Sequence, residues 1–245
     1  MNDLSDIDSL SRQVEELMRE KQHVISIVSH DLRSPLNRIF ALVQLLQLNG
    51  SNLTGEQKDY LDKMHLIIAD GLAMMRNLVD YRNLEYRTID MLPETFNVGD
   101  LIETSVKNFK PIATKKSIEF RVECENNLMV TTDKHCLSRV IDNLLSNAVK
   151  FSAQEKKVWV RADTLLINHL KIEVQDEAGG FLSDEVAKLF QKFQKLSTRP
   201  TAGESTTGLG LFIAKSMAEK IGGKITCTTT EGLGSLFSVE LPKTN

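Results

Sequence analysis

A histidine beside a carboxylate lies in a helical stretch, in the sequence Ser29-His30-Asp31-Leu32-Arg33-Ser34-Pro35-Leu36. A neutral imidazole is a nucleophile near neutral pH, and the carboxylate of Asp31 can accept the ring proton as the other nitrogen attacks. Pro35 removes a backbone donor and crowds the preceding turn, which costs a helix about 3 kcal/mol or more. We therefore predict a locally loosened helix that lets an exposed His30 approach a partner. From these residues alone, a solvated surface histidine is the alternative.

A second group of polar side chains lies within Asp142-Asn143-Leu144-Leu145-Ser146-Asn147-Ala148-Val149-Lys150-Phe151. Asn143, Asn147 and Lys150 are spaced by four and three residues, so they share one face of a helix. Two amide oxygens and a cation suit a metal-bound triphosphate, and the ring of Phe151 could stack on a base. The alternative is a set of solvated surface asparagines.

Two glycine-containing segments could bring the backbone close to the same ligand. Val174-Gln175-Asp176-Glu177-Ala178-Gly179-Gly180-Phe181 places a carboxylate and glycines at the end of an expected strand, although an ordinary strand-to-turn junction has the same pattern. Thr207-Gly208-Leu209-Gly210-Leu211 opens an expected helix, where free backbone amides attract phosphate. The polar stretch 194–207 between them is long for a loop, and we predict that it forms a lid.

In this order the segments resemble the motifs of two-component sensor histidine kinases, and the resemblance spans nearly all of the chain. Residues 29–36 resemble the H box, whose H-[ED]-x-x-x-P histidine is autophosphorylated in that family. Residues 142–151 resemble the N box, and residues 174–181 and 207–211 resemble the two glycine boxes. Leu189-Phe190-Gln191-Lys192-Phe193 resembles the F box, and the alternative is a pair of aromatics that closes a short amphipathic helix. Under either interpretation we expect the aromatics to be hydrophobic anchors.

The resemblance implies roles for individual residues, with ATP and Mg²⁺ as the bound groups. Asn143 and Asn147 would hold magnesium, Lys150 would meet a phosphate, and Asp176 would accept a hydrogen bond from the adenine amino group. Catalysis would fall to His30 as nucleophile and Asp31 as proton acceptor, and an aspartate of a response regulator would then receive the phosphoryl group. The further predicted nucleotide-binding residues are Phe151, Gly180, Thr207, Gly208, Leu209 and Gly210.

Three positions bear on rival functions. Gyrase-type and mismatch-repair ATPases of the same fold place a water-activating glutamate where Asn143 stands, and an amide cannot act as that base. Ala178 replaces the first glycine of the family's D-x-G-x-G pattern, so we expect Gly179 to supply the lost backbone freedom. This departure motivates an alternative function, a pseudokinase scaffold that relays conformation without phosphotransfer. Ser34 stands where many relatives carry the Thr or Asn used to dephosphorylate the regulator, which leaves phosphatase activity open.

The elements that position these residues follow from hydrophobic spacing. Apolar residues recur every three or four positions from Leu10 to Leu46, which predicts one long helix. If Val28 and Leu32 form its buried line, the histidine between them lies about 200° away, on the outer side. Thr54-Gly55-Glu56-Gln57 is a capping box that opens a second helix. Two such stripes leave apolar surface uncovered, so we predict a homodimer through a four-helix bundle.

After residue 93, short alternating runs separated by helical stretches predict an α/β sandwich. We expect strands at 118–122, 158–162, 170–174, 224–229 and 235–241, and helices at 98–114, 133–149 and 209–221. The predicted fold class is α+β: a two-helix hairpin over residues 1–92 that forms the dimeric bundle, followed by an ATP-binding sandwich over residues 93–245. We expect the two domains to hinge near Pro93.

Composition excludes several classes of protein. The 245 residues carry 30 Lys and Arg against 33 Asp and Glu, a net charge of −3 that gives no basic excess for nucleic acid. No apolar run approaches the roughly 20 residues of a membrane span, so we expect no membrane contact within this chain, although a fuller protein could be membrane-anchored. The cysteines Cys124, Cys136 and Cys227 are widely spaced, which predicts neither disulfides nor zinc and favours a cytoplasmic location.

Overall fold

The computed structural model describes residues 2–50, 52–86, 91–166, 169–194 and 196–242. For residues 2–11, 15, 21–23, 30, 86 and 166 this description covers the backbone only. The chain divides into two compact units, Met1–Thr88 and Ile89–Asn245. Across the described residues, no helix combines the length and the apolar character needed to cross a membrane.

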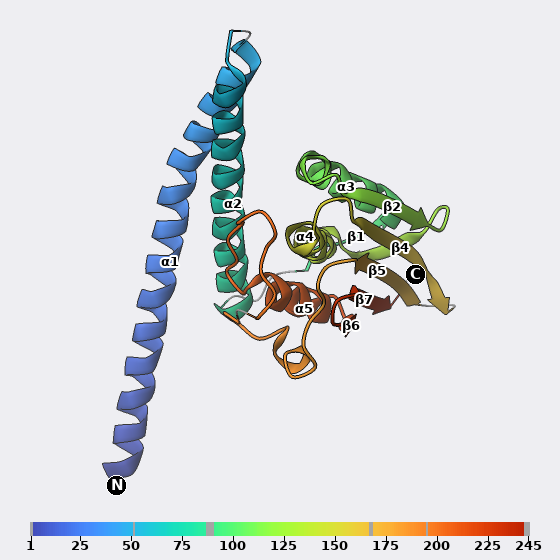
Figure 1. Ribbon diagram of the computed structural model, residues 1–245. Coiled ribbons are helices and arrows are strands. Elements are labelled where there is room, and N and C mark those ends of the chain that lie inside the picture. The colour runs from blue at the N-terminus through green and yellow to red at the C-terminus, as the bar shows by residue number, and fades with distance from the viewer. Residues whose placement is uncertain (1, 51, 87–90, 167–168, 195, 243–245) are drawn as a thin grey trace. The chain divides into compact units, whose positions relative to one another are not determined.

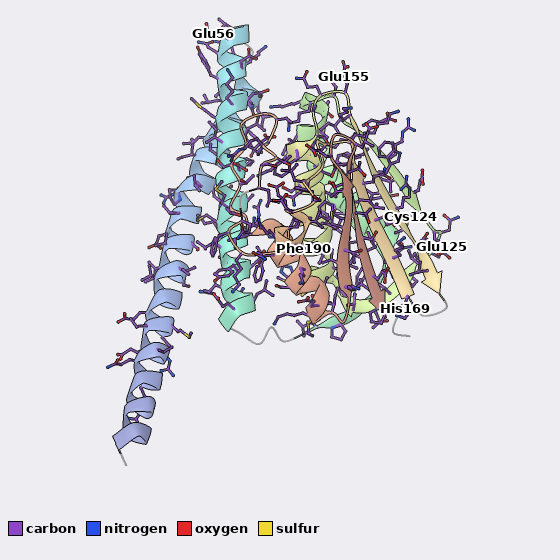
Figure 2. All side chains as sticks on the ribbon, turned by 60° about the horizontal axis from the view of Figure 1, so that its bottom comes forward. Glu56, Cys124, Glu125, Glu155, His169 and Phe190 are labelled. Carbon is purple, nitrogen blue, oxygen red and sulfur yellow. The ribbon has the colours of Figure 1, made fainter. Side chains whose placement is uncertain are left out.

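The first unit is a helical hairpin, drawn in blue and teal in Figure 1, with α1 over Asn2–Asn49 and α2 over Gly55–Tyr86. The capping box forms as predicted: the Gln57 N–H donates to Thr54 Oγ1 at 3.2 Å, and the Thr54 N–H donates to Gln57 Oε1 at 2.9 Å. Glu56 marks this tip of the hairpin in Figure 2. Helix α1 runs through Pro35 as part of one continuous helix.

The face of α1 that packs on α2 includes Leu36 and Val43 of the predicted apolar stripe but not Val28 and Leu32. Val28 and Leu32, expected on the buried line, are 42% and 45% exposed, whereas Ser29 is buried. Further along α1, Leu36 and Val43 follow Ser29 at steps of seven residues and pack in the core against α2. Helix α1 therefore carries two apolar faces, and α2 covers one of them. The core of the hairpin contains Val43, Leu61, Ile68 and Leu72, with Leu36, Phe40 and Leu53 packed against it.

The second unit contains a five-stranded sheet in the order β2-β4-β5-β7-β6. Strands β2 and β4 are parallel, and the other neighbouring pairs are antiparallel. All five strands expected from the alternating runs are present. Their bounds are Glu119–Cys124 (β2), Lys157–Leu166 (β4), His169–Asp176 (β5), Lys224–Thr230 (β6) and Gly234–Pro242 (β7).

Three helices cover one face of this sheet, as Figure 1 shows: α3 over Val98–Lys115, α4 over Lys134–Phe151 and α5 over Gly210–Lys220. Along β5, buried and half-buried residues alternate, because every second side chain points toward the helices. These helices match the predicted ones to within a few residues. The core therefore lies between one sheet face and a layer of three helices, and α4 and α5 pack side by side within that layer.

Two strands and a short helix depart from the prediction. Strand β1 (Pro93–Asn97) and strand β3 (Met129–Asp133) pair as a separate antiparallel ribbon. Both strands are short and partly polar, so their sequences carry too little alternation to predict them. Before Phe190, where the alternative to the F box has a short amphipathic helix, there is one 3₁₀ turn, η1, over Val186–Lys188.

Candidate functional site

Two amides on α4 face the first residue of α5. Asn143 is 6% exposed, and its Nδ2 donates to Arg139 O at 2.8 Å, one turn earlier in the helix. A Cβ placed on Gly210 would lie 3.2 Å from Asn143 Oδ1 and 3.9 Å from Asn147 Oδ1. Both amide oxygens therefore converge on a glycine that leaves room in front of them. Oxygen donors are the ligands that Mg²⁺ prefers, so this group fits a magnesium-bound phosphate.

The end of α4 meets the predicted lid. The Lys150 Nζ donates to Ser205 O at 3.0 Å, so the ammonium lies against the loop that precedes α5. Phe151, predicted to stack on the base, is the last residue of this helix and is half-buried. The same helix therefore brings the two amides and the cation to one side of the loop.

The two ends of the loop are joined by a hydrogen bond between their main chains. Within the described residues 194 and 196–209 it contains neither helix nor strand. The Phe193 N–H donates to Gly208 O at 2.9 Å, and a Cβ on Gly208 would lie 2.5 Å from Gln194 O. Gly208 has a φ of +67°, so both its conformation and its surroundings require glycine. The structure confirms a long loop here.

A local hydrogen bond fixes the chain where the loop leads into α5. The Leu209 N–H donates to Thr207 Oγ1 at 3.2 Å, and the Leu209 side chain is buried. A contact between Leu209 and a nucleotide would therefore involve its backbone.

Asp176 ends β5 as a buried carboxylate. Its Oδ1 accepts the Ala178 N–H at 2.9 Å and the Ser235 N–H at 3.2 Å. Burial raises the pKa of Asp176 to about 6, although the two backbone donors act in the opposite direction. The side chain lines a shallow pocket together with Thr229 and Gly234. At neutral pH this carboxylate is ionised and can accept a hydrogen bond from a ligand.

The substitution in the first glycine box causes no backbone strain. Ala178 is buried, and it is absent from the described non-glycine residues with positive φ, which are Ser117, Asn127, Glu155 and Phe193. The expectation that Gly179 compensates is wrong: its φ is not positive, and a Cβ there would meet nothing within 4 Å. Gly180 needs the freedom instead, because its φ is +67° and a Cβ would lie 2.3 Å from Thr230 O.

The F-box aromatics are not both anchors, contrary to the prediction. Leu189 is buried, whereas Phe193 is 57% exposed, with a φ of +59°. The left-handed turn at this residue directs its N–H to Gly208 and keeps the side chain out of the core. Phe190 is half-buried beside α5, where the Lys215 Nζ lies 6.0 Å from its ring centroid (Figure 2).

The predicted phospho-acceptor lies in the other unit. His30 belongs to α1, and its side chain lies outside the described part of the structure. The prediction that this side chain points outward therefore stays a prediction. Its neighbour Asp31 is exposed. Ser34 is also exposed, and its Oγ accepts from Arg38 Nη2 at 3.4 Å.

Residues outside the motifs, which the sequence did not predict, also hold the loop. Glu185 accepts the Ser197 N–H at 2.6 Å and the Ser197 Oγ–H at 2.8 Å. The first of these bonds is the main cause that holds the pKa of Glu185 below its usual value. Thr198 Oγ1 donates to Gly180 O at 2.9 Å, and Lys116 binds the other end of the loop. Their sequence context is that of ordinary polar turns, so no local pattern indicates these contacts.

Two family models match the chain. The model described as "His Kinase A (phospho-acceptor) domain" matches residues 20–87, which include His30. The model described as "Histidine kinase-, DNA gyrase B-, and HSP90-like ATPase" matches residues 132–245, which include both amides, Asp176 and Gly210. The two matches follow one another in the order that the motifs predict.

Known proteins with similar sequences are sensor kinases. The chain is 32% identical over 246 residues to the sensor protein GacS of Pseudomonas syringae pv. syringae, a match that covers 97% of this chain and 27% of that protein. It is 31% identical over 235 residues to the aerobic respiration control sensor protein ArcB of Escherichia coli (strain K12), covering 93% and 29%. The chain thus spans less than a third of the length of these relatives.

A solved structure shares the fold. Full-length ShkA in complex with AMPPNP aligns with a TM-score of 0.67 and 24% identity, over 90% of this chain and 46% of that one. The fold, a helical hairpin followed by a sheet covered by three helices, is thus also present in a solved structure. With its phospho-acceptor domain followed by a histidine kinase-type ATPase domain, the chain belongs to the sensor histidine kinases.

Proposed function

We propose that this chain transfers the γ-phosphoryl group of Mg-ATP to His30 and then passes it to an aspartate of a response regulator. The observation that carries the proposal is the convergence of the Asn143 and Asn147 amide oxygens on Gly210, in a chain whose other domain carries an H-box histidine. An amide pair with no carboxylate base at this position favours storage of the γ-phosphate over its hydrolysis.

Each pocket residue has a task in holding ATP. The Asp176 carboxylate accepts from the adenine amino group, and Asn143 and Asn147 hold the magnesium ion. The bound ion supplies charge neutralisation and fixes the orientation of the triphosphate. Lys150 meets a phosphate oxygen, and the backbone at Gly208 and Gly210 allows the close approach of the triphosphate at the start of α5.

In the bundle, the phosphotransfer step uses His30 as the nucleophile and Asp31 as the proton acceptor. A bond forms between an imidazole nitrogen and the γ-phosphorus, while the bond from that phosphorus to the β–γ bridging oxygen breaks and ADP leaves. Asp31 accepts the proton of the other ring nitrogen. For this step the ATPase domain, which we propose to begin at residue 93, swings about the connection near Pro93 toward the bundle. The phosphohistidine then donates to the regulator's aspartate.

The uncovered face of α1 supports a homodimer. Of the twelve large apolar side chains that are exposed on the described part of α1, eight lie along one face, and a contiguous apolar surface of this kind indicates a protein interface. A second hairpin would cover them and complete a four-helix bundle. These residues are Val14, Leu17, Val24, Val28, Leu32, Ile39, Leu42 and Leu46.

The pseudokinase alternative was motivated by Ala178 in the first glycine box, and the backbone conformation of this residue no longer supports it. Ala178 occupies a backbone conformation that any L-residue adopts, so the altered glycine box gives no reason to expect impaired ATP binding.

The test is incubation of the purified chain with γ-labelled ATP and Mg²⁺, in the wild type and in the variants His30→Gln and Asn147→Asp. We expect label on the wild type alone, stable in alkali and labile in acid, as for a phosphoramidate. Addition of a response-regulator receiver domain should then move the label to that protein in an acid-stable form. Label that persists on His30→Gln would refute the assignment of the acceptor.

A further inference from the structure

Lys116 is a buried cation that the proposed chemistry does not use. It lies in the turn between α3 and β2, and its side chain is 8% exposed. Its Nζ donates to Val149 O at 2.9 Å, to Lys150 O at 3.1 Å and to Thr201 Oγ1 at 2.9 Å, and it forms an ion pair with Glu204 Oε1 at 2.6 Å. Burial of an ammonium is costly unless it is paired and hydrogen-bonded, and these four oxygens supply both.

These contacts join three segments that are far apart in the sequence. Val149 and Lys150 end α4, where the last carbonyls of a helix lack partners within it. Thr201 and Glu204 belong to the loop that precedes α5. The main chain of Lys116 is fixed as well, since its carbonyl accepts the Glu155 N–H at 3.1 Å; Figure 2 labels Glu155 in the turn before β4.

The loop is bound to the end of α4 by its own groups too. The Thr201 N–H donates to Lys150 O at 3.0 Å, and Thr201 Oγ1 donates to Ser152 O at 2.7 Å. Ser205, the residue after Glu204, provides the carbonyl that accepts from the Lys150 Nζ. The loop residues held by Lys116 are therefore adjacent to the one that positions the Lys150 ammonium.

We infer that Lys116 is a positioning residue for the triphosphate: by holding Thr201 and Glu204 on the end of α4, it sets where the loop lies and where the Lys150 ammonium can meet a phosphate. This inference rests on the proposed function, because it takes the loop to close over ATP. Lys116 itself touches no substrate, and its effect passes through the loop and through the carbonyl of Lys150.

The experiment compares the affinities for ATP and for adenosine in the full chain. Loss of the phosphate-positioning loop should weaken ATP binding and leave adenosine, which has no phosphate, nearly unaffected. For Lys116→Met we expect the Kd for ATP to rise about tenfold and that for adenosine by less than about twofold, since removal of one partner of a buried charge pair weakens the remaining contacts strongly. Glu204→Gln should raise the Kd for ATP by about threefold, because it keeps the acceptor and removes only its charge.

Two further variants separate positioning from stability. Thr201→Val removes the hydroxyl that binds Lys116 and Ser152 without leaving a buried charge, so it should fold even if Lys116→Met does not, and it should show the same selective loss of ATP affinity. Lys107→Met is the matched control, since Lys107 is an exposed lysine on α3, and both affinities should stay at the wild-type value.

The outcomes are distinct. If the wild type fails to bind ATP, the proposed function fails. If the wild type binds ATP but Thr201→Val and Glu204→Gln leave its affinity unchanged, or weaken ATP and adenosine equally, the positioning role of Lys116 is wrong and its contacts serve the fold alone.

Discussion

The two units differ in how much of their apolar surface they cover. In the second unit the residues of the sheet that face α3, α4 and α5 are buried, and the residues that we propose to bind the nucleotide are held by contacts within that unit. In the hairpin, α2 covers one face of α1, and the adjacent face with Val28 and Leu32 is left in solvent. The second unit buries its core as a single chain, whereas the hairpin leaves exposed the face that we propose as the dimer interface.

This difference assigns different consequences to substitutions in the two units. Changes in the second unit should alter ATP binding and the stability of that unit, because its contacts are internal. Changes on the exposed face of α1 should alter assembly and phosphotransfer while ATP affinity stays the same. The two activities can therefore be lost separately.

The largest expected effect is the complete loss of phosphoryl transfer in a variant that still binds ATP. His30→Gln should abolish labelling from γ-labelled ATP and keep the wild-type Kd for ATP, because the substituted residue lies outside the nucleotide-binding unit. Asn147→Asp should abolish both labelling and ATP binding, since it places the negative charge of a carboxylate beside the negatively charged phosphates. The measurement is labelling together with calorimetric ATP binding on each variant. Loss of ATP binding in His30→Gln would show that the two units do not act independently.

Next in size is the effect on dimerisation. Leu32→Lys places a charge on the uncovered face of α1, and we expect the dimer dissociation constant to rise about 30-fold or more, as for a central interface residue. The hairpin itself should remain helical, because Leu32 is 45% exposed in the single chain.

The matched variant is Leu72→Lys, which changes a residue of α2 in the buried core between the two helices. Leu72 is 8% exposed in the core of the hairpin, so a lysine there should destabilise the hairpin itself, by about 3 kcal/mol or more. Sedimentation equilibrium and helical circular dichroism distinguish the two results. A Leu32→Lys protein that dimerises like the wild type would mean that another surface joins the chains.

A smaller effect distinguishes two adjacent glycines in the second unit. Gly180→Ala should destabilise that unit by about 2 kcal/mol or more, because the residue has positive φ and its added methyl group meets Thr230 O. Gly179→Ala should change stability by less than about 0.5 kcal/mol, since its Cβ would point into open space. Urea unfolding of both variants, followed by Trp159 fluorescence, measures the difference. Equal destabilisation would contradict the backbone conformations described here.

The sequence predicted the features that depend on neighbouring residues. The capping box of Thr54 and Gln57 forms because its two hydrogen bonds close within four residues. The long helices and the five strands of the main sheet appear because their hydrophobic period repeats over enough residues to be distinguished. The roles of the predicted site residues remain predictions, although the structure brings Asn143, Asn147 and Gly210 together.

The features that the sequence did not predict depend on distant contacts. Whether Gly179 or Gly180 needs positive φ is decided by Thr230, which lies about 50 positions further along the chain. The covered face of α1 is selected by α2, so the spacing of apolar residues alone could not distinguish it from the face left exposed. Lys116 looks like a surface lysine until Glu204, 88 positions later, is placed beside it.

The smallest predicted effect is on pH dependence, and it depends on Asp176 alone. Its pKa is raised to about 6 by burial, so the carboxylate that accepts from adenine is lost as pH falls through 6. Between pH 7.5 and 5 we expect the Kd for ATP to rise about tenfold, in inverse proportion to the ionised fraction of Asp176. Asp176→Asn is the control, because it keeps an acceptor oxygen and removes the titration, so its pH profile shows what ATP itself contributes.

As pH falls, the stability of the second unit should increase while its affinity for ATP decreases. The pKa of Asp176 in the folded chain lies above its ordinary value of 3.8, so between these two values the folded state binds more protons than the unfolded state. The free energy of unfolding of the wild type, relative to Asp176→Asn, should therefore rise as pH falls from above 6 toward 4, while ATP affinity declines. If both quantities fell together, the acid sensitivity would come from groups other than Asp176, because one buried carboxylate whose ionised form is the binding form cannot produce that pattern.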